Sequence, residues 1–174
     1  MVMNRILVAY ATRAGSTVEV AQTIGQVLSG TGAMVEVKPV KSLRDVNGYD
    51  AAIIGSAIRM GQWLPEAVQF VKTNRDALRR IPTAYFLVSG TLREDTPDVQ
   101  QKVSAYLNPV RQILEPTSIG LFAGKIDYGK LSFLERFMAQ TMKEPEGDWR
   151  NWEAIRNWTR ALEPTFARAP LALH

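Results

Sequence analysis

The stretch that decides the fold runs from Arg5 to Gly30 and reads RILVAYATRAGSTVEVAQTIGQVLSG. Its first part, Ile6–Tyr10, is a short apolar run of the kind found in strands buried on both faces. Its last part repeats apolar residues at helical spacing, at Val20, Ile24, Val27 and Leu28. Between them, residues 11–17 (ATRAGST) place hydroxyls, a glycine and an arginine at the junction. The stretch therefore predicts a strand, a polar loop and a helix.

The same alternation continues along the chain. Five short apolar runs predict strands at Ile6–Tyr10, Met34–Val37, Ala51–Ile54, Ala84–Val88 and Ser118–Ala123. Longer segments with helical spacing separate them, and Pro65 and Pro97 stand where first helical turns would begin, with Thr96 as an N-cap. Strands that alternate with helices imply right-handed crossovers and a parallel sheet covered on both faces. We expect one α/β domain over residues 1–174.

Composition excludes several kinds of chemistry. The 174-residue chain has no cysteine, and its single histidine is His174, so thiol chemistry, cysteine-ligated metals and histidine triads are not expected. The net charge of +4 comes from basic residues interleaved with acidic ones, which does not favour nucleic-acid binding. No signal peptide or membrane-spanning run is apparent. We expect a cytoplasmic protein without a metal site and name no catalytic residue.

The loop after the first strand is the sharpest candidate for a binding site. Free N–H groups at a helix start, beside hydroxyls, bind phosphate well, and Gly15 permits a close backbone approach. The alternative is a capped turn, because Ser16 and Glu19 have the spacing of a capping box. The residues alone leave both interpretations open.

Three further loops would meet this one. Ligands of open parallel sheets bind outside the carboxyl ends of the strands, where the strand order reverses. The loops leaving the third, fourth and fifth strands read GSAIRMGQW (55–63), SGTLRED (89–95) and AGKIDYGK (123–130). With the first loop, each carries a cation: Arg13, Arg59, Arg93 and Lys125. We predict a rim that favours anions.

The loop ATRAGST at a strand–helix junction resembles the FMN phosphate loop of the flavodoxin family. The resemblance covers nearly the whole chain, and it implies a flavodoxin-like three-layer α/β/α sandwich with a five-stranded parallel sheet in the order 2-1-3-4-5. Within the family, VAYATRAGST, AIIGSAIRMGQW and NWEAIRNWTRAL look most like the branch that contains menaquinone-dependent protoporphyrinogen oxidase. The resemblance implies FMN as the cofactor.

Carried over by position, the resemblance assigns two sets of cofactor-binding residues. Those expected to wrap the FMN phosphate are Thr12, Arg13, Ala14, Gly15, Ser16 and Thr17. Those expected to frame the flavin ring are Ser56, Ala57, Ile58, Arg59, Met60, Gly61, Ser89, Gly90, Thr91, Leu92 and Arg93. Trp63 is placed to stack on the flavin or shield it, or alternatively to anchor the helix that begins at Pro65.

The expected function is that of an FMN-dependent oxidoreductase. Positive charge near the ring would favour reduced, anionic flavin, which suits accepting electrons from an organic substrate such as a porphyrinogen and passing them to a quinone. Three alternatives stay open: an electron-transfer flavodoxin that docks a redox partner protein, an NAD(P)H:quinone reductase, and an interaction module without flavin.

An extended segment at about 124–148 follows the fifth strand. Leu131, Leu134, Met138 and Met142 recur about four apart, with Phe133 and Phe137 beside them. Such a stripe predicts packing on the protein's own core. The alternative is a docking surface at residues 130–143 for a quinone, a partner or the inner face of the membrane.

Overall fold

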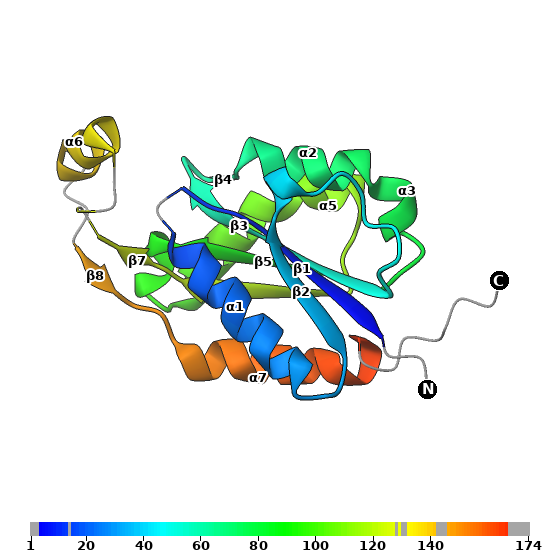
Figure 1. The fold of residues 1–174 in the computed structure, drawn as a ribbon. Coiled ribbons are helices and arrows are strands. Elements are labelled where there is room, and N and C mark those ends of the chain that lie inside the picture. The colour runs from blue at the N-terminus through cyan, green and yellow to red at the C-terminus, as the bar shows by residue number, and fades with distance from the viewer. Residues whose placement is uncertain (1–3, 14, 128, 130–131, 142–145, 167–174) are drawn as a thin grey trace.

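The central sheet contains five parallel strands, flanked by helices (Figure 1). This computed structural model describes residues 4–13, 15–127, 129, 132–141 and 146–166. The parallel strands are β1 (Arg5–Ala11), β2 (Met34–Pro39), β3 (Ala51–Arg59), β5 (Thr83–Ser89) and β6 (Ser118–Ala123). Their order is β2-β1-β3-β5-β6, so the predicted 2-1-3-4-5 order is confirmed. A short strand β4 (Gln62–Trp63), which was not predicted, pairs antiparallel with β3.

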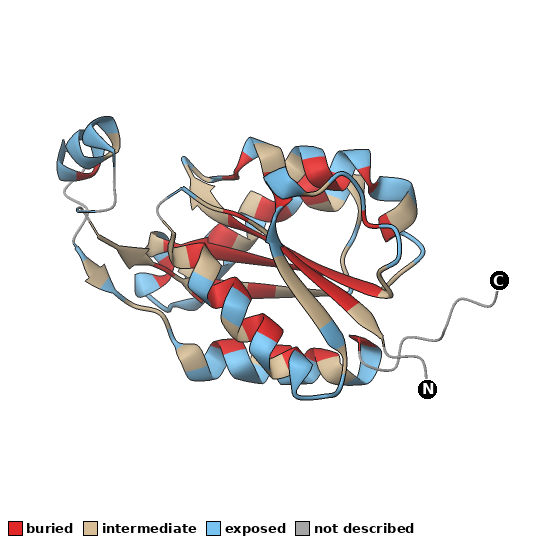
Figure 2. Cartoon of the chain, viewed as in Figure 1, coloured by how far each residue is buried: buried red, intermediate tan, exposed pale blue. Residues whose placement is uncertain are grey.

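Helices cover both faces of the sheet, as predicted. On one face lie α1 (Ser16–Ser29) and α7 (Trp152–Phe166). On the other lie α2 (Pro65–Thr73), α3 (Arg75–Leu78), α4 (Pro97–Ser104) and α5 (Asn108–Ile113). Figure 2 shows the buried residues concentrated in the strands and on the helix sides that face them. The sheet thus separates two apolar clusters, one built around Leu7 and Tyr85 and the other around Val8 and Phe86.

Proline and capping signals mark several helix boundaries. Pro65 and Pro97 open α2 and α4, and the Thr96 hydroxyl accepts a hydrogen bond from the Val99 amide at 3.3 Å. The helical rhythm from Val99 to Val110 predicts continuous helix, but a 3-10 turn, η3 (Ala105–Leu107), interrupts it. Pro109 explains the break, because it lacks the N–H that a continuous α-helix would bond to residue 105.

The last helix begins later than its sequence predicts. Residues 149–162 have the expected pattern, but α7 starts at Trp152, where the Asn151 side chain accepts a hydrogen bond from the Ala154 amide at 3.0 Å. Trp149 therefore precedes the helix, and its amide donates to Gly124 O at 3.2 Å. Trp158 packs edge-on against Phe122 with ring centroids 5.5 Å apart.

The extended segment leaves and re-enters through a small ladder. Strand β7 (Lys125–Ile126) pairs antiparallel with β8 (Gly147–Asp148), and between them lies α6 (Phe133–Thr141). Two residues of the predicted stripe, Leu131 and Met142, lie outside the described residues.

Close packing in the core fixes Gly55 of β3. A methyl group added at Gly55 would lie 2.0 Å from Cζ of Phe86, whose ring is fully buried. We expect Gly55→Ala to lower the free energy of unfolding by about 3 kcal/mol, because the ring cannot move without displacing its neighbours. Urea denaturation measures this, and adding Phe86→Leu to the same chain should recover part of the loss. An unchanged midpoint for Gly55→Ala would contradict this packing.

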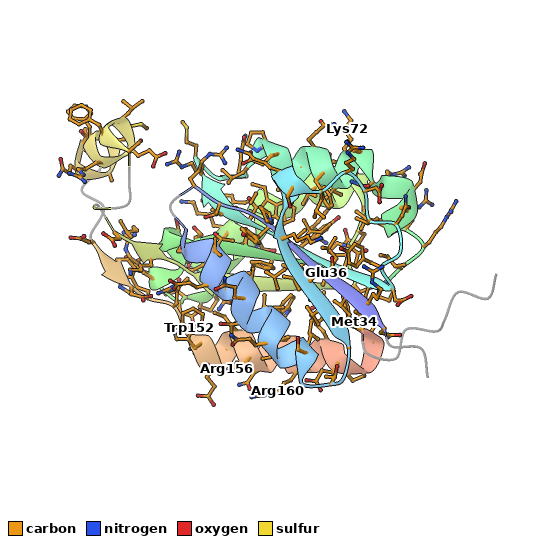
Figure 3. The ribbon with its side chains drawn as sticks, in the orientation of Figure 1. Met34, Glu36, Lys72, Trp152, Arg156 and Arg160 are labelled. Atoms are coloured by element: carbon orange, nitrogen blue, oxygen red, sulfur yellow. The ribbon has the colours of Figure 1, made fainter. Side chains whose placement is uncertain are left out.

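A polar cluster surrounds Glu36 on β2, the edge strand of the sheet (Figure 3). Its carboxylate accepts hydrogen bonds from the Tyr49 hydroxyl, from Lys38 at 3.0 Å and from Arg5 at 3.1 Å. These donors, Tyr49 first, lower the pKa of Glu36 to about 2. Burial and the neighbouring carboxylate raise the pKa of Tyr49 to about 12. The cluster joins β1, β2 and the loop before β3.

The lowered pKa of Glu36 predicts a pH-dependent contribution to stability. Its ionised form is favoured in the fold, so the contribution is present above the ordinary value of 4.5 and is lost as the pH falls towards about 2. Glu36→Gln should therefore destabilise the protein more at about pH 7 than at about pH 3 in urea titrations. Glu153→Gln, at an exposed position of α7, is the control. An equal loss at both pH values would contradict the assignment.

Candidate functional site

A cavity of about 320 Å³ lies at the carboxyl ends of the parallel strands. The strand order reverses between β1 and β3, and residues following both strands line the cavity. Twelve of the predicted site residues line it: Thr12, Arg13, Ser16, Ala57, Ile58, Arg59, Met60, Gly61, Ser89, Gly90, Thr91 and Arg93. The predicted loops therefore converge on one cavity at the topological switch point.

A hydrogen bond to the Thr12 hydroxyl stabilises the turn of the first loop. The Gly15 amide donates to Thr12 Oγ1 at 3.0 Å, and Gly15 has a φ of 90°, a left-handed conformation that favours glycine. Apart from the chain neighbours of Gly15, no atom of the described residues lies within 4 Å of the position that a Cβ on Gly15 would occupy. Helix α1 then begins at Ser16, so its positive end points towards open space beside the cavity. Ala14, also predicted to bind, lies outside the described residues.

The capping-box interpretation of this loop is wrong. Gly15, rather than Ser16, is the N-cap of α1, and among the described residues no side chain makes a capping hydrogen bond there. Glu19, the expected acidic partner, instead forms an ion pair with Arg150. In the first turn, the Thr17 hydroxyl is buried and has no hydrogen-bond partner among the described residues. A buried hydroxyl without a partner is costly, so this helix start fits a ligand that supplies an acceptor.

The second loop is a tight hairpin. Met60 and Gly61 connect β3 to β4 with φ values of 50° and 72°, the pattern of a two-residue primed turn. Met60 is 91% exposed despite its apolar side chain. Ser56 supports the hairpin from beneath: its hydroxyl accepts from the Leu64 amide at 2.9 Å and donates to Ala57 O at 2.8 Å. Ser56 therefore holds the loop in place and does not line the cavity.

The third loop forms the opposite wall. Ser89 Oγ accepts a hydrogen bond from the Thr91 amide at 3.2 Å and opens a 3-10 turn, η2 (Gly90–Arg93). Gly90 lies against Ile126 of β7: an added Cβ would be 3.2 Å from Cδ1 of Ile126. Arg93 donates to Gly90 O at 3.3 Å. The wall is thus built from both the η2 turn and the base of the extended segment.

Two of the four predicted cations are neutralised by carboxylates. Arg13 is paired with Glu66 of α2, which raises the pKa of Arg13 and lowers that of Glu66. Arg59 is paired with Glu135 of α6, at 2.9 Å. Within the described part of the chain, Arg93 and Lys125 form no ion pair shorter than 4 Å. The rim is therefore less positive than its four cations suggest, and its excess charge lies at Arg93 and Lys125.

Like Ser56, two further residues that were predicted to contact the flavin ring lie outside the cavity lining. Trp63 is 3% exposed and packs edge-on against Tyr85, with ring centroids 5.2 Å apart. This placement fits the helix-anchor interpretation and contradicts a stacking platform, because the indole belongs to the core beneath α2. Leu92 is 7% exposed and points away from the cavity, lining a separate hollow with Trp149. Gly15 and Thr17 belong to the loop without lining the cavity itself.

Five lining residues were not among the predicted cofactor-binding residues, although three of them belong to the predicted loop at residues 123–130: Val88, Tyr106, Gly124, Lys125 and Ile126. Tyr106 follows the helical spacing of its segment, so the sequence predicts that it packs in the core. The break at η3 turns it towards the hairpin, where an added Cβ on Gly61 would lie 3.3 Å from its ring. Lys125 was expected at this edge as a cation but not as a cofactor ligand. In the sequence, Pro109 is the signal that could have shown that the helix breaks near Tyr106, and therefore that Tyr106 faces the cavity.

This doubly wound fold, with its cavity at the switch point, defines a flavodoxin-like protein. The family model described as "Flavodoxin domain" matches residues 7–151, and the chain belongs to the flavodoxin family.

Two curated relatives span most of the chain. The chain is 24% identical over 172 residues to "Protoporphyrinogen IX dehydrogenase [quinone]" of Escherichia coli strain K12, covering 91% of this chain and 94% of that protein. It is 26% identical over 184 residues to the protein of the same name from Leishmania major, covering 97% of this chain and 77% of that one. Among solved structures, a mutant flavodoxin of Fusobacterium nucleatum bound to flavin mononucleotide has a TM-score of 0.56 at 14% identity, covering 94% of this chain and 98% of that one. That similarity concerns the fold.

Proposed function

We propose that the protein is an FMN-dependent oxidoreductase whose cavity holds the flavin. The observation that carries the proposal is the start of α1: a left-handed Gly15, no side-chain cap, and a buried Thr17 hydroxyl that has no partner in the described chain. A phosphate would supply acceptors to these donors and lie at the positive end of the helix. The residues present therefore fit the phosphate of FMN.

The loops on either side of the cavity suit a flat ring. Residues 57–61 and 89–93 form opposite walls, and Tyr106 adds an aromatic side chain beside the hairpin. Val88 and Ile126 add apolar side chains to the lining of the cavity. When bound, FMN would supply the redox chemistry, accepting electrons from one substrate and passing them to another. The walls orient the ring and exclude water from part of it.

The cations select the kind of substrate. Arg93 and Lys125 line the cavity without a carboxylate within 4 Å among the described residues, so they are available to anionic groups. Because curated relatives carry the name "Protoporphyrinogen IX dehydrogenase [quinone]", we infer a porphyrinogen as the donor and a quinone as the acceptor. The propionate groups of a porphyrinogen match these two cations. Their positive charge also favours negative charge developing in the cavity.

A second candidate is an electron-transfer flavodoxin that docks a redox protein. The net charge of +4 and the two unpaired rim cations favour it, because an acidic partner would be attracted to this edge. Electron transfer that weakens steeply with salt, without turnover of a small substrate, would identify this function.

Thr17→Val is expected to separate ligand binding from stability. The substitution keeps the side-chain shape and removes a buried hydroxyl that lacks a partner, so the free protein should be as stable or more stable. FMN affinity, measured by quenching of flavin fluorescence, should fall at least about tenfold because a hydrogen bond to a charged group is lost. Thr159→Val is the control: this buried hydroxyl donates to Ile155 O at 2.8 Å, so stability should fall and FMN affinity should not. Unchanged FMN affinity in Thr17→Val would contradict the phosphate assignment.

Arg93→Gln tests the substrate. With the flavin-loaded protein, protoporphyrinogen and a soluble naphthoquinone, this variant should raise KM for the porphyrinogen about tenfold, because a charge-assisted contact is removed. Arg80→Gln, at an exposed position outside the cavity, should behave as the wild type. Absence of porphyrinogen oxidation by the flavin-loaded wild type would reject this substrate while leaving flavin binding intact.

A further inference from the structure

The extended segment meets the rest of the protein at its helix and again at its base. Helix α6 contacts the hairpin through Glu135, which pairs with Arg59 at 2.9 Å. The large apolar side chains of α6 face solvent: Phe133 is 88% exposed and Phe137 is 61% exposed. The predicted packing of this stripe on the core is therefore wrong. The base of the segment, where β8 leads into α7, lies beside α1 (Figure 1).

Arg150 ties the base of the segment to its neighbours. Its side chain is 6% exposed and forms ion pairs with Asp148 of β8, at 2.6 Å, and with Glu19 in the first turn of α1. The guanidinium carbon also lies 4.7 Å from the ring centroid of Trp152, at the start of α7. Hydrogen bonds to Asp148 and Glu19 raise the pKa of Arg150. One buried cation therefore joins β8, α1 and α7.

Without Arg150, Glu19 would place an unpaired negative charge near the start of α1. A rise of about 1.5 Å per residue puts Glu19 roughly 6 Å further along the helix axis than Gly15, the N-cap. This separation is shorter than the Debye length of about 8 Å at physiological salt, so screening between the two positions is incomplete. A free carboxylate there competes with any bound anion for the positive end of the helix.

The charges around this helix start balance only when Arg150 is present. Asp148 lies opposite Lys125 in the β7–β8 ladder, and Lys125 lines the cavity. Both cations, Arg150 first, lower the pKa of Asp148. Arg150 and Lys125 together match the two carboxylates, Glu19 and Asp148. Removal of Arg150 would leave this group with one net negative charge at the edge of the site.

We propose that Arg150 is a positioning residue for the flavin phosphate: by pairing with Glu19, it removes a competing negative charge from the start of α1. The inference rests on the proposed function, because the phosphate is that of FMN. Arg150 is not among the residues that line the cavity, and it lies 131 positions from Glu19 in the sequence. It therefore acts on FMN affinity through Glu19 and not by contact with the ligand.

A purely structural role of Arg150 would have a different effect on ligand binding. If Arg150 only anchored the segment, its loss would displace Lys125 and Ile126, which belong to the cavity wall. That displacement would weaken the binding of FMN and of riboflavin alike, because the two ligands share the same ring. Loss of charge compensation acts on the phosphate alone, and riboflavin has none. The comparison of the two ligands therefore separates the two roles.

The test is titration of the full chain with FMN and with riboflavin, followed by quenching of flavin fluorescence at low and at high salt. Arg150→Gln should bind FMN about tenfold less tightly at low salt, and the difference should shrink at high salt. Its riboflavin affinity should stay within about twofold of the wild type. Adding Glu19→Gln to Arg150→Gln should restore FMN affinity, because the uncompensated charge is removed.

Two further variants complete the experiment. Glu19→Gln alone changes a side chain that is 49% exposed and leaves Arg150 with an excess positive charge, so FMN affinity at low salt should rise about threefold. This variant tests the proposal even if Arg150→Gln does not fold, which circular dichroism would show. Arg111→Gln is the matched control: Arg111 pairs with Glu115 at 2.7 Å, outside the cavity lining, so both affinities should equal those of the wild type.

Several results would overturn the proposal. Arg150→Gln could bind FMN as tightly as the wild type, FMN and riboflavin affinities could fall by the same factor, or Glu19→Gln could fail to restore FMN binding in the double variant. Unchanged or lower FMN affinity in Glu19→Gln alone would also overturn it. A wild type that does not bind FMN would reject the proposed function together with this inference. FMN binding by the wild type that Arg150→Gln reproduces would reject this inference alone.

Discussion

The pairing of β1 with both β2 and β3 is the constraint on which the rest of the structure depends. Ile6 lies between Val35 and Ala51 in the sheet, and this register continues to the end of the strand. Because the chain leaves β1 towards β2 and leaves β3 towards β5, on the opposite side, two crossovers diverge at the neighbouring carboxyl ends of β1 and β3. The gap that they leave contains the start of α1 and the β3 hairpin, and the cavity follows from it.

Much of this arrangement could be predicted from the sequence, because it depends on local patterns. The buried runs predict the five parallel strands, and Thr96 and Pro97 give the start of α4. The strand order came from the resemblance of ATRAGST to a family loop. The lining of the cavity by residues of the four predicted loops then follows from the topology. Whether those residues bind a cofactor remains a prediction.

What could not be predicted depends on contacts between distant residues. The sequence predicts that Arg13 and Arg59 are unpaired cations. In the structure, however, Arg13 pairs with Glu66, 53 positions further along the chain. Arg59 pairs with Glu135, 76 positions further along. From the sequence, Trp63 could stack on a flavin or pack in the core. Its edge-on contact with Tyr85 shows that it packs in the core. The stripe at residues 133–138 reads as core, since amphipathic spacing alone cannot show which side of a helix meets the protein. An ion pair of Glu135 decides that instead.

The central claim is that the start of α1 holds the phosphate of a flavin, and parallel titrations of the wild-type protein with FMN and with riboflavin test it most directly. Both ligands carry the same ring and differ in the phosphate. We predict that FMN binds at least about a hundredfold more tightly than riboflavin, because riboflavin lacks the charged group to which several hydrogen bonds would be made. Equal affinities, or no binding of either ligand, would contradict it.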